Sequence, residues 1–160
     1  MPTGPLSGVR VIDLTTIYSG PISTAILGDQ GADVIKIEAA AGDPMRQGPT
    51  RRNGVTASFA MMNRNKRSIV VDIRTDAGRD ILFDLVRGAD VLVENFRPGV
   101  MDRLGVGYDD LRAVIRGWFS PQSMVLVPPA LTPDDVFMTL SFRLSPVLLI
   151  YMQRITASRP

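Results

Sequence analysis

Short apolar runs alternate with helix-forming segments through the first two-thirds of the chain, and this alternation restricts the possible folds more than any other feature. Residues 9–14 and 33–38 are each predicted as a buried strand, because β-branched and apolar residues follow one another there. The segment between them is predicted as a helix over residues 22–29, with Pro21 at its first position and Gly31 after its end. This order predicts a βαβ unit of an open, doubly wound parallel sheet with a right-handed crossover.

The same alternation continues to about residue 113 and predicts an α/β domain. Residues 39–56 interrupt it with a long loop rich in Gly, Pro and Arg, and loops of that length are often functional. The further predicted elements are a strand at residues 68–73, a helix capped by Thr75 and stopped by Gly88, a strand at residues 90–93, and helices at residues 99–104 and 108–113.

Composition excludes several kinds of chemistry. The chain contains no Cys and no His, which excludes disulfides, thiolate catalysis, Ser-His-Asp catalysis and the common zinc sites. A formal charge of +2 gives no indication of a nucleic-acid partner. The first residues show no signal-peptide pattern, and the apolar stretch at residues 146–152 is far shorter than the roughly 20 residues of a membrane span. We therefore predict a soluble, cytoplasmic protein with no metal and no membrane contact.

The segment Glu94-Asn95-Phe96-Arg97-Pro98-Gly99 carries the strongest indication of a binding site. It follows the predicted strand at residues 90–93, and ligands of open parallel sheets bind at the carboxyl ends of the strands. Asn95 could hydrogen-bond a base, Phe96 could stack on it and Arg97 could pair with a phosphate. The structural alternative is that Asn95 and Pro98 only form a turn and that Phe96 belongs to the core.

Two other polar pairs also have structural alternatives. Asp13 and Glu38 end two neighbouring predicted strands and could form a carboxylate pair for acid–base chemistry, but the favoured interpretation is that Asp13 caps the turn that follows it. Lys66 and Arg67 are expected on a solvated loop, as is usual for short charge runs.

Five short segments match the signatures of one known family in order and spacing. They are LSGVRVIDLT at residues 6–15, SGP at 19–21, GADVIKIE at 31–38, NRNKRS at 63–68 and ENFRPG at 94–99, the last followed by Leu104-Gly105. The family that they resemble is the class III, CaiB/BaiF-type CoA-transferases, which also contains α-methylacyl-CoA racemases. The resemblance covers residues 6 to about 113.

The resemblance implies the N-terminal, incomplete part of a Rossmann-like parallel sheet with flanking helices that binds coenzyme A. It also implies a longer enzyme that forms an interlocked homodimer. One position departs from the family, since some members have an Arg that reaches the CoA phosphate where this chain has Ala39. The positions that the resemblance assigns to CoA are Tyr18, Ser19, Val71, Arg74, Asn95, Phe96, Arg97 and Arg103.

The activity implied by the resemblance is the transfer of CoA from an acyl-CoA to a carboxylic acid through a covalent aspartyl intermediate. No catalytic residue is assigned in this chain, because Asp134 and Asp135 lie in a tail without resemblance to the family. Two alternatives stay open. One is an α-methylacyl-CoA racemase, and the other is a non-catalytic, CoA-binding remnant.

The tail differs in character from the rest of the chain. Residues 114–160 contain no Lys, no Glu, one Gly and six Pro, so one interpretation is a Pro-rich second half of the domain. A second interpretation is a frameshift, since codons can be chosen for residues 115–148 that read, one base further, as the Gly-rich loop and Tyr-Asp pair typical of the family. We therefore hypothesise a CoA-binding segment at residues 1–113 and an out-of-frame, poorly ordered tail at residues 114–160.

Overall fold

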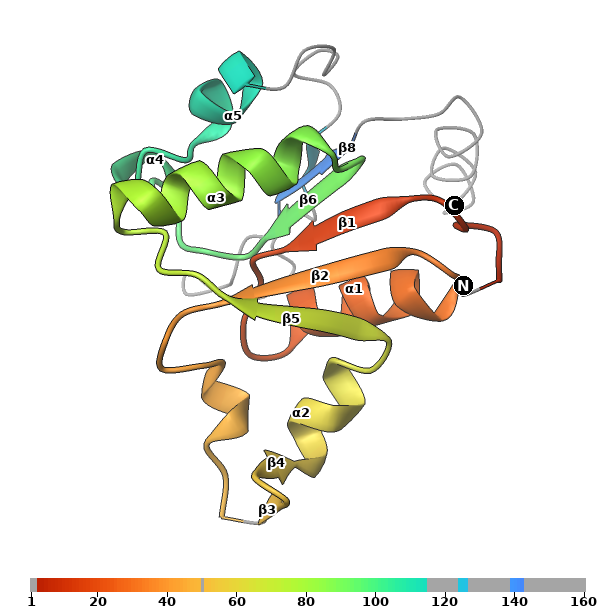
Figure 1. Ribbon diagram of the computed structural model, residues 1–160. Helices are drawn as coiled ribbons and strands as arrows, with labels where there is room; N and C mark the ends of the chain where they lie inside the picture. The colour runs from red at the N-terminus through yellow and green to blue at the C-terminus, as the bar shows by residue number, and fades with distance from the viewer. Residues whose placement is uncertain (1–2, 50, 115–123, 127–138, 143–160) are drawn as a thin grey trace, which may run out of the picture.

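A parallel sheet of four strands forms the centre of the structure, in the order β5-β2-β1-β6 (Figure 1). The computed structural model describes residues 3–49, 51–114, 124–126 and 139–142. The four strands are β1 (Arg10–Asp13), β2 (Asp33–Glu38), β5 (Lys66–Val70) and β6 (Val91–Glu94). The predicted parallel α/β fold is therefore confirmed, and the predicted strand at residues 33–38 has the observed bounds.

Helices cover both faces of this sheet. In Figure 1, α1 (Ser19–Asp29) lies behind the sheet and α3 (Asp76–Arg87) lies in front of it. Two further short helices, α4 (Val100–Arg103) and α5 (Tyr108–Val114), follow β6. Because strand side chains alternate between faces, the sheet has two hydrophobic cores. One contains Ile12, Ile35, Leu82 and Leu92, and the other contains Val11, Val34 and Val91, with Leu27 packed against it.

The caps of α3 follow the sequence prediction. The Thr75 hydroxyl accepts a hydrogen bond from the amide of Gly78 at 3.1 Å, and Gly88 is the C-cap residue. The predicted start of α1 is late by three residues, because this helix begins at Ser19. Gly20 lies so close to the loop after β1 that a Cβ there would come within 2.3 Å of the Thr15 side chain, so this early turn of α1 requires glycine.

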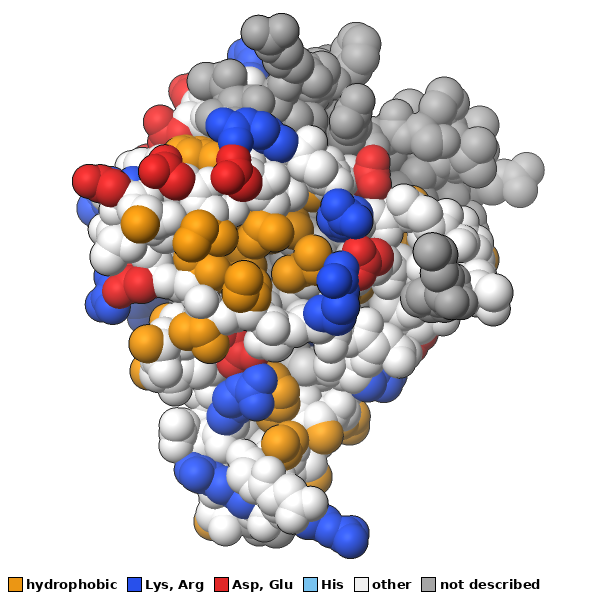
Figure 2. All heavy atoms as spheres, viewed as in Figure 1, with side chains coloured by type: hydrophobic (Ala, Val, Ile, Leu, Met, Phe, Trp, Pro, Cys, Tyr) orange, Lys and Arg blue, Asp and Glu red, His pale blue; other side chains and the backbone are white. Residues whose placement is uncertain are grey.

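An arm at residues 44–62 projects below the sheet in Figure 1, where the sequence predicts mainly a loop. Its tip carries the exposed Arg51 and Arg52, which contribute to the Lys and Arg side chains gathered there in Figure 2. The prediction missed a helix, which the Thr56 hydroxyl caps by accepting a hydrogen bond from the Phe59 amide at 3.1 Å. The elements of the arm are the 3-10 helix η1 (Pro44–Arg46), the hairpin β3 (Arg51–Arg52) and β4 (Val55–Thr56), and α2 (Ala57–Met62).

The start of β5 corrects a second prediction. Lys66 and Arg67 are not loop residues but begin the strand, which ends at Val70 rather than at residue 73. Only Arg67 is solvated, whereas the Lys66 ammonium is buried and lies 2.9 Å from an Asp13 carboxylate oxygen. β5 is the edge of the sheet, and hydrophobic side chains gather on the face shown in Figure 2. The exposed large hydrophobic residues include Ile69 of β5 and Ile81 of α3.

Two short strands extend the sheet beyond β6. β8 (Thr139–Phe142) pairs antiparallel with β6, and β7 (Met124–Leu126) pairs antiparallel with β8. The expectation that residues 114–160 are poorly ordered falls mostly on positions outside the described residues. Asp134 and Asp135 also lie outside them. Within the described part of the chain, no helix has the length and apolar character of a membrane span.

Candidate functional site

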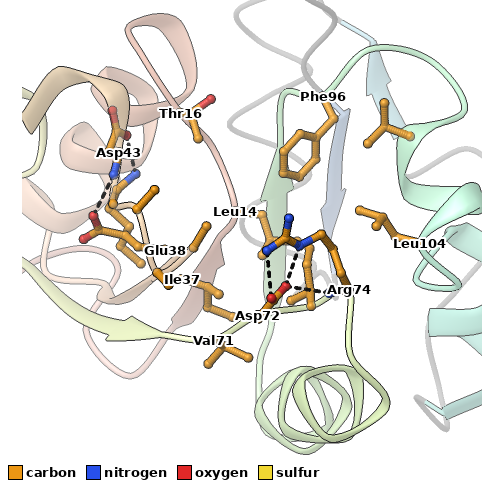
Figure 3. A pocket seen from close by; sticks show the side chains of 17 residues that line it. Leu14, Thr16, Ile37, Glu38, Asp43, Val71, Asp72, Arg74, Phe96 and Leu104 are labelled. Atoms are coloured by element: carbon orange, nitrogen blue, oxygen red, sulfur yellow. Dashed lines mark hydrogen bonds and ion pairs between the residues drawn. The ribbon is translucent and has the colours of Figure 1, made fainter. Parts of the chain in front are cut away.

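A cleft of about 450 Å³ opens at the carboxyl ends of the four parallel strands (Figure 3). Leu14 and Thr16 line it directly after β1, Ile37 and Glu38 line it at the end of β2, and Phe96 lines it after β6. The remaining lining residues are Lys36, the segment from Ala39 to Asp43, the segment from Val71 to Arg74, and Val100 and Leu104 at α4. The cleft therefore lies where ligands bind in open parallel sheets.

Three of the predicted site residues meet in this cleft, namely Val71, Arg74 and Phe96. Val71 is buried and also belongs to the core, and Phe96 is partly buried against the same core. The Phe96 ring and the Arg74 guanidinium lie on the same side of the cleft, while Glu38 and Asp43 lie on the other (Figure 3).

The other predicted site residues do not line the cleft. Tyr18 is the N-cap residue of α1 and Ser19 its first residue, and both are exposed. Arg97 and Arg103 are also exposed, one on the turn after β6 and the other at the end of α4. Asn95 is turned toward the β1 loop, where its amide is hydrogen-bonded to the backbone of Thr16.

Arg74 forms a two-pronged ion pair with Asp72 at the rim of the cleft. Its Nε and one terminal nitrogen each donate to a different Asp72 carboxylate oxygen at 2.8 Å. The hydrogen bonds from the Arg74 side chain, followed by that from its amide, lower the pKa of Asp72 to about 2. The guanidinium is mostly exposed, so an anionic ligand could reach it.

Glu38 joins the sheet to the arm at the opposite side. Its carboxylate accepts two hydrogen bonds from Arg46 at 2.7 Å, one from the Ser68 hydroxyl at 2.5 Å and one from the Asp43 amide at 3.0 Å. Burial raises the pKa of this carboxyl, but the hydrogen bonds outweigh burial and lower the pKa to about 2. The Arg46 guanidinium also stacks on the Phe59 ring at 3.7 Å from its centroid.

Two fully buried ion pairs lie on the α1 side of the sheet, and the residues of one of them, Lys36 and Asp43, also line the cleft. Lys66 pairs with Asp13 at 2.9 Å, and Lys36 pairs with Asp43 at 3.0 Å, while Lys36 also donates to the Thr15 carbonyl at 2.6 Å. Desolvation lowers the pKa of Lys66, although Asp13 opposes this shift. Asp13 is paired with Lys66, and Glu38 is paired with Arg46. Asp13 and Glu38 therefore do not form the acid–base pair considered from the sequence.

The expected capping role of Asp13 is confirmed. One of its carboxylate oxygens accepts from the Thr15 amide at 2.8 Å and from the Thr15 hydroxyl at 2.5 Å. The other oxygen accepts from the Thr24 hydroxyl and from Lys66. This single side chain therefore fixes the β1 loop, α1 and β5 to one another.

Sequence reasoning missed the small residues on the β2 side of the cleft. Ala39, Ala40, Ala41 and Gly42 line it after the end of β2, where the notable sequence feature was the lack of an Arg at position 39. These residues could have been predicted, because they directly follow a predicted strand and ligands of open parallel sheets bind beyond the carboxyl ends of the strands. Among the described residues, no group of three or more carboxylate, His or Cys side chains is placed to hold a metal ion.

A parallel α/β sheet with helices on both faces, and a cleft at its strand ends, defines a Rossmann-like α/β protein with a candidate ligand cleft. Within this class, a family model described as CoA-transferase family III matches residues 6–116. The chain belongs to CoA-transferase family III.

Individual relatives agree with this family. The acetyl-CoA:oxalate CoA-transferase of Acetobacter aceti is 46% identical over 114 residues, which cover 71% of this chain and 29% of that protein. The succinyl-CoA:glutarate CoA-transferase of Mus musculus is 46% identical over 109 residues, which cover 67% of this chain and 25% of that protein. A crystal structure of a CaiB/BaiF family protein from Brucella suis matches with a TM-score of 0.66 and 43% identity, covering 70% of this chain and 31% of that one. The chain thus matches between a quarter and a third of the length of these relatives.

Proposed function

We propose that the cleft binds the nucleotide end of coenzyme A or of an acyl-CoA. The observation that carries this proposal is the placement of Phe96 and Arg74 together at the strand ends of a family III chain. The ring offers a stacking surface for adenine, and the edge of the guanidinium that does not face Asp72 offers two hydrogen bonds to a phosphate. The cleft volume of about 450 Å³ lies within the range of small-molecule sites.

Two exposed Arg residues assist at the rim in this proposal. Arg97 and Arg103 are exposed close in sequence to the lining residues Phe96 and Leu104, so they add positive charge for the phosphates. Ala39 supplies no cation on the β2 side, so phosphate binding depends on the Arg residues of the other side. The proposed contacts of Tyr18 and Ser19 lie at the start of α1, outside the cleft lining.

For the whole protein we propose the transfer of CoA between two carboxylic acids, supported by the names of the family III relatives. An Asp carboxylate attacks the thioester carbonyl, the C–S bond breaks, and the CoA thiolate leaves behind a mixed anhydride. The thiolate then attacks the aspartyl carbonyl and releases the donor acid. The acceptor carboxylate attacks the resulting aspartyl-CoA thioester, the C–S bond breaks, and a second mixed anhydride forms as the CoA thiolate leaves. The thiolate then attacks the acceptor carbonyl of this anhydride, which gives the new acyl-CoA and the free Asp. In this proposal the substrates are an acyl-CoA and a carboxylic acid, and the whole enzyme is a cytoplasmic homodimer.

We also propose that residues 1–113 are the CoA-binding segment and that residues 114–160 are translated out of frame. No residue of the described chain is assigned as the nucleophile, so the 160-residue chain is expected to show no transferase turnover. Reading the coding DNA across the codons for residues 113–115 tests the frameshift. A neighbouring frame that is closed, or unlike the family, would contradict it.

The binding proposal is tested by titrating CoA into the 160-residue chain in a calorimeter, after circular dichroism and urea unfolding have established that it is folded. Arg74→Ala is expected to weaken binding roughly 10- to 100-fold, the usual value of hydrogen bonds to a charged group. Arg87→Ala is the matched control, because Arg87 is an exposed Arg that pairs with Asp84 at the other end of α3. Folded protein that does not bind CoA would overturn the proposal.

The racemase alternative is separated from transfer by a different measurement on a family member carrying this segment in frame. Racemisation requires exchange of the α-proton of the acyl group with solvent, whereas CoA transfer does not. Incubation with acyl-CoA in deuterium oxide is expected to leave the α-carbon unlabelled while CoA passes to added carboxylate.

A further inference from the structure

Ile17 has a left-handed backbone with φ of +72°. A β-branched residue in this region is an outlier, because its Cβ crowds the backbone. Among the described residues, the other non-glycine positions with positive φ are Asn53 and Asn65, and Asn tolerates this conformation. Neighbouring structure must therefore hold Ile17 in place.

Asn95 supplies two hydrogen bonds to the residue before Ile17. Its Oδ1 accepts from the Thr16 amide and its Nδ2 donates to the Thr16 carbonyl, both at 2.9 Å. We call this pair of bonds the Thr16 clamp. It connects residues 79 positions apart and lies partly buried, where paired hydrogen bonds fix one geometry.

The residue before Thr16 is fixed as well. The buried Lys36 ammonium donates to the Thr15 carbonyl at 2.6 Å, and Asp13 accepts from the Thr15 amide at 2.8 Å. The backbone is thus held at two successive residues from β2, from the end of β1 and from the turn after β6. Ile17 lies directly beyond these anchors and directly before Tyr18, the N-cap of α1.

The clamp connects Thr16, which lines the cleft, to Asn95, whose neighbour Phe96 also lines the cleft. Thr16 lines it after β1, and Phe96, the neighbour of Asn95, lines it after β6. The spacing between Thr16 and Phe96 therefore depends on the clamp, and releasing Ile17 to a right-handed backbone would change the direction in which the β1 loop leaves the sheet.

We propose that Asn95 is a positioning residue, which holds Ile17 left-handed and so keeps Thr16 and Phe96 at the spacing that a CoA nucleotide requires. This inference rests on the proposed function of the cleft, and it replaces the earlier expectation that Asn95 hydrogen-bonds the base. Both heteroatoms of its amide are engaged with Thr16.

The test compares Asn95→Ala, Ile17→Gly and the double variant in the 160-residue chain, with CoA as the titrated probe. Asn95→Ala is expected to weaken CoA binding roughly 5- to 30-fold, because Ile17 then returns to its preferred backbone and few molecules remain competent. Ile17→Gly is expected to bind within about threefold of the parent chain. The double variant is also expected to bind within about threefold, since Gly adopts both hands about equally.

Amide hydrogen exchange at Thr16 supplies a readout that does not involve CoA. Exchange is expected to be slow in the parent chain and fast in both variants that lack Asn95, even though the double variant recovers affinity. Asn53→Ala is the matched control, because it removes an Asn from a left-handed position in the turn between β3 and β4, and it should alter neither measurement. Asn95→Asp provides a second route if Asn95→Ala does not fold, since it keeps the acceptor for the Thr16 amide and removes the donor to the Thr16 carbonyl.

The outcomes separate the clamp from the proposed function. A folded Asn95→Ala chain with unchanged CoA affinity would overturn the inference. A double variant that binds CoA as weakly as Asn95→Ala would also overturn it, because that result indicates a direct contact of Asn95 with CoA. If the parent chain does not bind CoA, the proposed function of the cleft fails. The clamp is then judged by exchange at Thr16, where accelerated exchange without Asn95 supports it and unchanged exchange refutes it.

Discussion

Replacement of Glu38 by Gln is expected to remove one large contribution to the acid dependence of folding stability. The Glu38 side chain is almost fully buried, and Arg46, Ser68 and the Asp43 amide all donate to its carboxylate. Gln keeps the shape of the side chain but carries no charge. The amide nitrogen of Gln is a hydrogen-bond donor, and the three groups around this position are donors too, so none of them can accept a hydrogen bond from it.

The magnitude follows from the pKa of Glu38, which changes from 4.5 to about 2 on folding. At roughly 1.36 kcal/mol per pKa unit, this difference corresponds to about 3 kcal/mol of stability. Because the folded pKa is lowered, the contribution is complete above the unfolded pKa of 4.5 and is lost as the pH falls through the folded value of about 2. Glu38→Gln should therefore be about 3 kcal/mol less stable at pH 7 and nearly equal to the parent chain at pH 2.

Urea unfolding followed by circular dichroism at several pH values between 7 and 2 measures this difference. Asp80→Asn is the control, because Asp80 is an exposed carboxylate on α3, and it should change stability by less than about 0.5 kcal/mol throughout. A Glu38→Gln deficit that stays constant between pH 7 and pH 2 would refute the argument, since the lost stability would then come from packing and not from charge.

Further predictions concern the buried charge, the core and a helix cap. Lys66→Met leaves Asp13 as an unpaired buried carboxylate and should reduce the free energy of unfolding by about 3–5 kcal/mol at pH 7, measured with urea. Leu82→Ala, at a fully buried position of α3, should cost about 2–5 kcal/mol, whereas Ile81→Ala, next to it but 44% exposed, should cost much less in the same assay. Thr75→Ala removes the cap of α3 and should lower the melting temperature by an amount equivalent to about 1 kcal/mol, and an unchanged melting temperature would contradict the capping role.

Short-range sequence patterns were sufficient to predict the bounds of β2 and the ends of α3. The bounds of β2 follow from the β-branched residues Val34, Ile35 and Ile37, and the ends of α3 follow from Thr75 and Gly88. The helix α2 escaped prediction because it has six residues and buries only Phe59 and Met62, too few for a helical period to be visible. Short helices of this kind depend on their tertiary contacts.

Partners distant in sequence explain the remaining differences. Lys66 was expected in solvent because charged side chains are rarely buried unless paired, and its partner Asp13 lies 53 residues away. The placement of Arg74 and Phe96 in one cleft follows from the rule on strand ends, which needs only the strand order. The position of Asn95 against Thr16 could not be read from the chain, because its partner is 79 residues distant and is a backbone group.

The strand order also has a consequence for the time at which the sheet is completed during synthesis. β1 pairs with β2 about 20 residues later in the chain, but its other neighbour, β6, lies about 80 residues later. At roughly 5–20 residues per second, the ribosome delivers β6 several seconds after β1. The half-sheet β5-β2-β1 is therefore expected to form first and to keep one side of β1 open for that interval, which makes the docking of β6 the late and slow step of folding.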